Sequence, residues 1–439
     1  MSEENHEDFN NLDNLELQNS DIPCYKTKSF IFILISFLVF IIAIGVFLYF
    51  FILKENENKN EYEKENGDEE DECLIYDKNK CLSCNLGYKL VDGKCIVNYS
   101  FKSEYITDYD NQTIPLIHEK YLDKINELII DGIKVNETCT KYTFNTAGIH
   151  KVFFLLNLSN MTSFDSMFSQ IENMTSINFS SLFNTENITY MSSMFDGCFK
   201  LKSLDVSKFD TRKVNSTYRM FWGMTYLTSL DVSNFDTRNV YWGDDMFCYL
   251  SNITFLNLSN FNGNNMYGMD SFIRGCESLK SVDFSNFNAP KLERARELFR
   301  DCHNLEYVNL TNFNAPNLKY MTYMFLFCRS LKSIDLSSFK AENVLDMKNI
   351  FYDCHSLTYV NMNGIKYNLT SYINQYPMFT RNSNLTYIDI SSWKPEDQDI
   401  IIFNEASELP LKGKIILRLD LYLIIKEQIP KGWSIIYAK

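Results

Sequence analysis

The 439-residue chain contains little histidine, glycine or proline. Its five histidines leave little material for catalysis or metal binding by imidazole groups. Glycine and proline are scarce while 45% of the residues are hydrophobic, which argues against a largely disordered chain. The formal net charge of −14 argues against nucleic acid and anionic lipid surfaces as partners.

The sequence motifs of common catalytic sites are also missing. The chain holds no H-E-x-x-H, G-x-S-x-G, G-x-G-x-x-G or G-x-x-x-x-G-K-[ST] sequence. Carboxylates are numerous, but they fall at repeated positions or in an acidic linker. We therefore expect no enzyme activity, no cofactor, no metal site and no small-molecule substrate.

One long apolar segment covers residues 30–53, with the sequence FIFILISFLVFIIAIGVFLYFFIL. It carries no charge, and as a helix its 24 residues would rise about 36 Å, enough to cross a bilayer. A buried core helix and a cleaved signal peptide are the alternatives. A signal peptide would have a shorter apolar region and a small-residue cleavage site. The best interpretation is an uncleaved transmembrane signal anchor.

Lysines flank this segment on both sides, so the positive-inside rule does not orient it. N-x-[ST] sequons, however, occur only after residue 53, although some are forced by the repeat described below. We expect an acidic, disordered cytoplasmic tail at 1–29, with Cys24 palmitoylated or unmodified, and an extracellular remainder at the plasma membrane. The candidate glycosylation sites are Asn98, Asn111, Asn136, Asn157, Asn187, Asn215, Asn252, Asn368 and Asn384.

An acidic linker at 54–72 leads to a short cysteine-rich module at 73–95. This module is too short to bury a core and needs covalent support. Its Cys73, Cys81, Cys84 and Cys95 could form two disulfides in any of three pairings, or hold zinc. An oxidising exterior favours disulfides. The C-x-x-C…G-Y…C pattern resembles the small EGF-like or furin-like modules of eukaryotic surface proteins.

A repeat of 26 residues dominates the rest of the chain. One apolar position recurs as Phe195, Phe221, Phe247, Ile273, Phe299, Phe325 and Phe351. Around it, apolar residues at i, i+3, i+4 and i+7 predict a short helix. After it, Leu204 and Val206 alternate with Asp205 and Ser207, which predicts a short strand. We therefore predict an α/β, leucine-rich-repeat-type solenoid of about nine turns over 161–393.

Two repeated positions invite chemical interpretations. Five turns place a cysteine at a position where other turns have Ile171, Met224 or Leu250, so the position is apolar and the cysteines are expected to be buried free thiols. The alternatives are disulfides between turns, or a metal site with His303 and His355. These cysteines are Cys198, Cys276, Cys302, Cys328 and Cys354. A strand position that is always Asp or Asn either fixes the turn backbone or forms a cation ladder.

The repeat phrase L-x-S-L-D-V-S-x-F-D-T-x-x-V-x-x-M-x-x-M-F-x-x-C-x-x-L resembles the BspA-like leucine-rich-repeat surface proteins of bacteria and protists. Turns at 252–288 and 359–393 depart from it. The anchor and the cysteine module suggest the protist type. The resemblance implies adhesion or recognition at the cell surface and supplies no ligand.

Solenoids need capped ends. We expect a β-rich N-terminal cap at 96–160, including a hairpin over 141–156 around Gly148, and Cys139 without an obvious partner. A C-terminal cap at 394–439 should contain a strand at 412–419 and a helix at 420–430.

Six aromatic residues replace polar residues at exposed positions of neighbouring turns: Tyr218, Trp222, Tyr226, Tyr241, Trp242 and Tyr267. They form the candidate recognition patch for an extracellular protein or glycan. The alternative is that they pack on one another, or under sugars at Asn215. We thus predict a membrane-spanning recognition or adhesion protein; a structural surface coat without a specific ligand is the alternative.

Overall fold

The computed structural model describes residues 73–77, 80–84, 87–91, 94–369, 378–395, 402–403 and 408–438. The predicted tail, transmembrane anchor and acidic linker therefore lie outside the described residues. No helix in the described part of the chain has the length and apolar character needed to span a membrane. Cys73–Lys439 forms one compact unit, and the description below concerns this unit alone.

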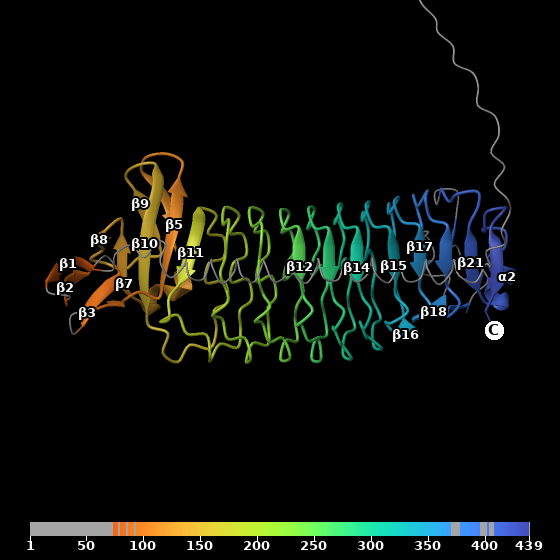
Figure 1. Ribbon diagram of the computed structural model, residues 1–439, viewed down its shortest axis with the longest axis horizontal. Coiled ribbons are helices and arrows are strands. Elements are labelled where there is room, and N and C mark those ends of the chain that lie inside the picture. The colour runs from red at the N-terminus through yellow and green to blue at the C-terminus, as the bar shows by residue number, and fades with distance from the viewer. Residues whose placement is uncertain are drawn as a thin grey trace, which may run out of the picture. The chain divides into compact units, whose positions relative to one another are not determined.

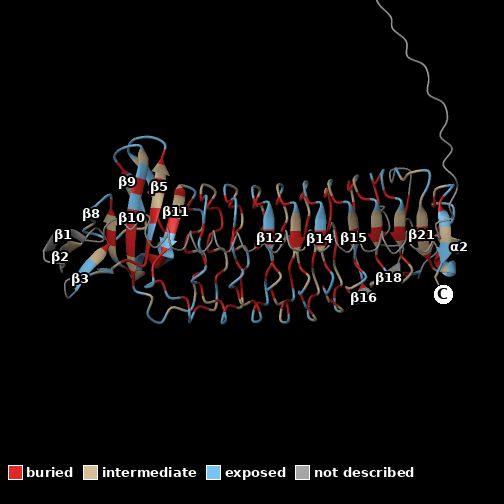
Figure 2. Ribbon diagram, viewed as in Figure 1, coloured by how far each residue is buried: buried red, intermediate tan, exposed pale blue. Residues whose placement is uncertain are grey.

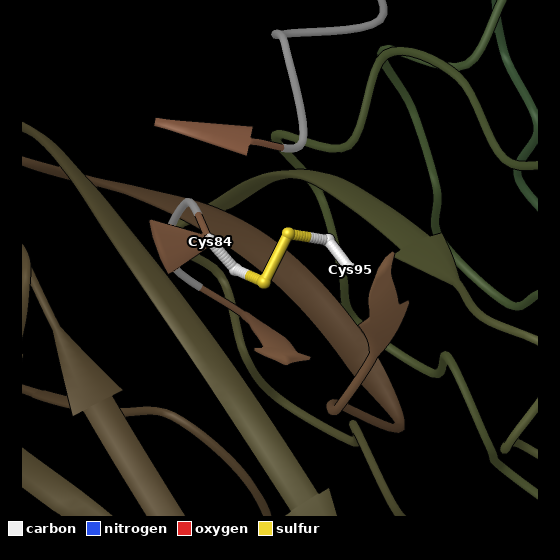
Figure 3. The surroundings of a disulfide bond; sticks show 2 residues. All are labelled: Cys84 and Cys95. Atoms are coloured by element: carbon white, nitrogen blue, oxygen red, sulfur yellow. A yellow bond between two sulfur atoms is a disulfide. The ribbon is translucent and has the colours of Figure 1, made fainter. Parts of the chain in front are cut away.

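The cysteine-rich module consists of two short antiparallel pairs. Strand β1 (Cys73–Asp77) pairs with β2 (Lys80–Cys84), and β3 (Tyr88–Val91) pairs with β4 (Lys94–Val97). A disulfide between Cys84 and Cys95 joins the two pairs (Figure 3). The side chains of Cys73 and Cys81 lie outside the described part, so the second predicted disulfide is untested.

A five-stranded sheet follows, in the order β11-β5-β10-β7-β8 (Figure 1). Its strands are β5 (Phe101–Thr107), β7 (Ile125–Ile130), β8 (Ile133–Lys134), β10 (Gly148–Leu156) and β11 (Met174–Phe179), and a 3₁₀ helix, η1 (Glu119–Lys124), precedes β7. Beside it, β6 (Gln112–Pro115) pairs with β9 (Lys141–Phe144). The predicted hairpin is wrong, because β9 pairs with β6 while β5 and β7 occupy both edges of β10.

Beyond this sheet the chain forms a β-solenoid, whose turns stack side by side in Figure 1. Its short strands pair in parallel and in register, as Leu256 with Val282 and then Val308. One row comprises β12 (Phe255–Asn257), β13 (Ser281–Asp283), β14 (Tyr307–Asn309), β15 (Ser333–Asp335), β17 (Tyr359–Asn361) and β19 (Tyr387–Asp389). A second row comprises β16 (Ala341–Val344), β18 (Ile365–Leu369) and β20 (Lys394–Pro395).

The predicted short helix in each turn is wrong. In its place the chain makes consecutive tight turns, in which two residues four positions apart have positive φ, such as Ser193 (55°) and Gly197 (76°). The N–H of Phe195 donates to Met220 of the next turn, whereas the N–H of Asp196 donates within its own turn to Ser193. In an α-helix, the N–H groups beyond the first turn all donate to carbonyls four residues earlier in the same helix. Here alternate N–H groups connect successive turns, and the i, i+3, i+4, i+7 spacing still directs the apolar side chains inward.

The core is built from columns of equivalent positions, and buried residues recur in every turn of the solenoid in Figure 2. Phe195, Phe221 and Phe247 stack with ring centroids 6.0 and 5.7 Å apart. The five repeat cysteines are buried free thiols, which confirms that interpretation. Each thiol donates to a main-chain carbonyl 29 or 30 residues earlier, as Cys302 does to Ile273 at 3.2 Å.

The Asp and Asn column closes the turn after each strand. In Asp205, Asp231, Asp283, Asp335 and Asp389 the Oδ1 atom accepts the N–H two residues later, at 2.8–3.0 Å. Asn257, Asn309 and Asn361 make the same bond. These bonds confirm that the column fixes the backbone, because either side chain supplies the oxygen that the turn requires.

The far end of the stack contains β21 (Lys414–Leu417), α2 (Leu419–Ile425) and β22 (Ser434–Tyr437), close to the expected strand and helix. Strands β21 and β22 continue the parallel row. Helix α2 is the one α-helix within the described ranges, so helix content is far below that of the predicted α/β solenoid.

Candidate interaction surface

A column of single β-bridges crosses the tight-turn side of the solenoid and positions the candidate patch. It runs through Ser163, Tyr190, Ser216, Trp242, Gly268, Arg294, Tyr320 and Asp346. The backbone is the same at each step while the side chain differs in size, charge and polarity. A position with constant geometry and variable chemistry is suited to carrying a turn-specific surface.

Three of the six predicted aromatics come together here. Tyr267 contacts Tyr241, with centroids 6.3 Å apart, and Trp242, with centroids 6.2 Å apart. Their exposed fractions are 39% for Tyr241, 48% for Trp242 and 39% for Tyr267. These three residues, with Arg294, are called the aromatic patch below. The three rings support one another and stay partly exposed, and the Lys291 ammonium lies 5.9 Å from the centre of the Tyr267 ring.

Gly268 makes room for Arg294 beside Trp242. The Arg294 guanidinium lies 5.6 Å from the Trp242 ring centre and reaches back two turns to Asp244 at 3.2 Å. A Cβ on Gly268 would lie 2.4 Å from Nη2 of Arg294 and 2.8 Å from Oδ1 of Asp244. Arg294 also pairs with Asp270 at 3.4 Å. The space beside Gly268 is thus occupied by the ends of the Arg294 and Asp244 side chains, and its backbone angles do not call for glycine.

The other three predicted aromatics lie apart from this patch in their contacts. Trp222 is half-buried, with the Arg219 guanidinium 4.4 Å from its ring centre and Tyr249 edge-on at 5.5 Å. Tyr218 and Tyr226 are 40% and 58% exposed and make no ring contact within the described part of the chain. Trp222 thus packs on residues outside the predicted six, and ring contacts among the six join only Tyr241, Trp242 and Tyr267 within the described residues.

Half-buried ion pairs continue across the following turns. Arg274 pairs with Glu297 at 2.6 Å, and Arg300 pairs with both Glu297 and Asp301 at 3.3 Å. Arg296 pairs with Asp270 at 3.4 Å and lies 4.4 Å from the ring centre of Tyr320. Guanidinium, carboxylate and aromatic groups alternate here, so this side of the solenoid differs chemically from turn to turn.

Burial disfavours the charged form of two neighbouring carboxyl groups, Asp244 and Asp245. Burial raises the pKa of Asp245 to about 6, against a smaller opposing effect of Arg219. Burial also raises the pKa of Asp244, opposed by the N–H of Asp270 and by Arg294. The N–H of Asp270 and the Arg294 guanidinium thus both favour the charged form of Asp244 against its burial.

The sequon positions are mostly accessible. Asn111, Asn136, Asn157, Asn187, Asn252 and Asn384 are exposed, and Asn98 and Asn215 are intermediate. The Asn368 side chain lies outside the described part. Cys139 is a free, half-buried thiol. No cluster of three or more His, Cys, Asp or Glu side chains suited to a metal ion occurs among the described residues.

Sequence reasoning missed Gly268, Arg294 and Asp244. A repeat alignment contains part of the signal, because the bridge column is less uniform than the core columns. The alignment could not reveal that Arg294 reaches Asp244 two turns away, because this ion pair is possible only where the turn between them has a glycine, Gly268.

The fold and this surface define a β-solenoid repeat protein. One family matches the repeat region over residues 162–282, 226–333 and 267–393, and its description is "Mycoplasma protein of unknown function, DUF285". Because these matches together cover more than half of the sequence, the chain belongs to this family. Membership is compatible with the BspA-like resemblance of the repeat phrase. The curated proteins contain no match to the sequence.

Proposed function

We propose that this is a cell-surface recognition or adhesion protein, in which a solenoid of about nine turns binds an extracellular protein through the aromatic patch. The contiguous exposure of Tyr241, Trp242 and Tyr267 carries the proposal. Trp, Tyr and Arg are the residues that dominate binding energy at protein interfaces. A half-buried Arg294 at the edge of the rings adds a donor whose orientation is already fixed by Asp244.

The remaining parts of the proposal come from the sequence. The apolar segment 30–53 anchors the chain, the N-terminus is cytoplasmic, and the cysteine module and solenoid are extracellular and glycosylated, as in a protist BspA-like protein. The protein has no enzyme activity. Protease added to intact cells should release the region beyond Lys54, and glycosidase should lower the mass of the released part. If the protease instead digests the tail before Lys28, the N-terminus is extracellular and the proposed orientation is wrong.

Adhesion of cells that display the full chain tests the patch. Trp242→Ala and Tyr267→Ala should each reduce attachment to ligand-bearing cells at least tenfold, because both rings lie at the centre of the patch. Tyr109→Ala is the matched control, since Tyr109 is 63% exposed and lies outside the solenoid. Protease treatment of the ligand-bearing cells should abolish attachment; loss after glycosidase treatment alone would indicate a glycan ligand.

The coat alternative makes a different prediction. A protein that only covers the membrane needs no turn-specific surface, so replacement of the patch would leave attachment unchanged. That result, with normal surface display and an unchanged thermal midpoint, would favour the coat over recognition.

A further inference from the structure

The strand side of the solenoid carries a second set of exposed aromatics. The first residue of successive strands is Phe255, Ser281, Tyr307, Ser333, Tyr359 and Tyr387. Phe255 and Tyr307 are 56% and 55% exposed. Aromatic and serine residues thus alternate from turn to turn until Tyr359, after which two tyrosines are adjacent.

The adjacent pair shows how rings are arranged in this column. Tyr359 and Tyr387 stack with centroids 4.5 Å apart and planes 14° apart, so one ring fills one turn. At Ser333 this ring is missing. Paired strands lie about 4.8 Å apart, so two steps of a continuous ladder correspond to about 9.6 Å. The place of one ring is therefore open between two tyrosines.

A hollow of about 230 Å³ occupies this place, with Tyr307, Ser333, Asp335 and Tyr359 among its lining residues. Strands β14 and β15 belong to different sheets, so the ladder is interrupted where the hollow lies. Its volume is several times the roughly 30 Å³ that one water occupies in the liquid. This is the space of a ligand group of several atoms.

The floor of the hollow is polar. The Asp335 carboxylate is held by the N–H of Ser337 at 2.8 Å and by the side-chain amide of Asn361 at 3.2 Å. A carboxylate has about four acceptor positions, so it can also accept ligand hydroxyls. The Ser333 and Thr311 side chains contribute hydroxyl groups beside it.

We propose that the Tyr307–Ser333–Tyr359 slot binds one neutral pyranose ring of a glycan. A puckered sugar ring presents C–H groups to an aromatic ring on each face and hydroxyls at its edge, which matches two tyrosine walls over a polar floor. A planar apolar ring would fit the same space, but it brings no edge hydroxyls to the Asp335 carboxylate. The acidic chain disfavours an anionic sugar. This site is independent of the aromatic patch.

The test uses the full chain in a zwitterionic, sugar-free detergent and an array of neutral hexose and N-acetylhexosamine oligosaccharides. Ser333→Tyr should abolish binding of the best oligosaccharide by filling the slot. Ser203→Tyr is its matched control, because it adds the same ring at the same position of the repeat between Ser176 and Ser229, and it should bind as well as the wild type. Tyr307→Ala should weaken binding at least tenfold, whereas Tyr307→Phe should stay within twofold.

The thermal midpoint of each variant shows whether it is folded; if Ser333→Tyr does not fold, the Tyr307 pair decides. Failure of the wild type to bind any neutral oligosaccharide would overturn the proposal. The proposal would also be overturned if folded Ser333→Tyr, or Tyr307→Ala, bound the oligosaccharide as tightly as the wild type. Neither result would bear on adhesion through Trp242.

Discussion

Replacing Gly268 with alanine should destabilise the solenoid through Arg294. Gly268 does not have a positive φ, so its backbone tolerates alanine, and the substitution alone would be neutral or stabilising. The new Cβ, however, would lie 2.4 Å from Nη2 of Arg294. The guanidinium must move away, which separates it from Asp244, whose side chain is 14% exposed.

The magnitude follows from this burial. Removing one partner of a fully buried ion pair costs about 3–5 kcal/mol. Arg294 is 33% exposed and Asp244 keeps the N–H of Asp270, so solvent and this bond offset part of the loss. We expect Gly268→Ala to lower the free energy of unfolding by about 1–2 kcal/mol.

A double-mutant cycle in urea separates this cause from general crowding. In an Arg294→Ala background, Gly268→Ala should cost less than in the wild type, because no guanidinium remains to displace and only the contact of the new Cβ with the Asp244 carboxylate is left. Gly243→Ala is the control, since its Cβ would meet Met266 and Phe272 rather than a charge, and its cost should be the same in both backgrounds. An equal cost of Gly268→Ala in both backgrounds would refute the role assigned to Arg294.

Three further outcomes are expected. Cys302→Ala should lower the free energy of unfolding in urea by roughly 1–2 kcal/mol, because it leaves a small cavity and removes one weak hydrogen bond. Mass spectrometry without reduction should find Cys302 unlinked, and a Cys302–Cys328 crosslink would contradict the buried free thiol. Asp245→Asn should match the stability of the wild type at pH 4 and exceed it by about 1–2 kcal/mol at pH 8, because the raised pKa of Asp245 in the folded state makes the wild type lose stability as the pH rises through about 6. An equal difference at both pH values would exclude titration of Asp245. Asp231→Ala should cost about 1 kcal/mol in urea unfolding while Asp231→Asn stays within about 0.5, and equal losses would show that charge, not the turn bond, matters.

The repeat period, the strand position and the buried columns were predictable, because each depends on a pattern within one turn. The short helix was not, because the spacing of Met191, Met194, Phe195 and Cys198 is equally compatible with tight turns. The destination of alternate N–H groups decides between them, and that is a contact between turns. The pairing of β9 failed similarly, because hairpin signals between neighbours do not reveal a distant competitor such as β6.

Of the candidate site, the exposure of Trp242 and Tyr267 could be inferred from polar residues at matching positions. The separation of Trp222 could not, because Arg219 and Tyr249 cover it from positions whose direction depends on positive φ. The slot at Ser333 could not be predicted either, because it also depends on contacts between turns. A serine is unremarkable in sequence, and becomes a site only when tyrosines stand on both sides of it.

The in-register stacking of turns has a consequence for how the length of this protein can change. Phe255 faces Ser281 and Ser281 faces Tyr307, so each turn meets its neighbour through the same positions, 26 residues apart. Loss or duplication of whole periods within this region preserves the core columns, whereas a change of another length must still leave the strands in register, as the 28-residue step from Tyr359 to Tyr387 does. Unequal recombination between repeats can therefore lengthen or shorten the stack, and in doing so it changes which surface side chains become neighbours.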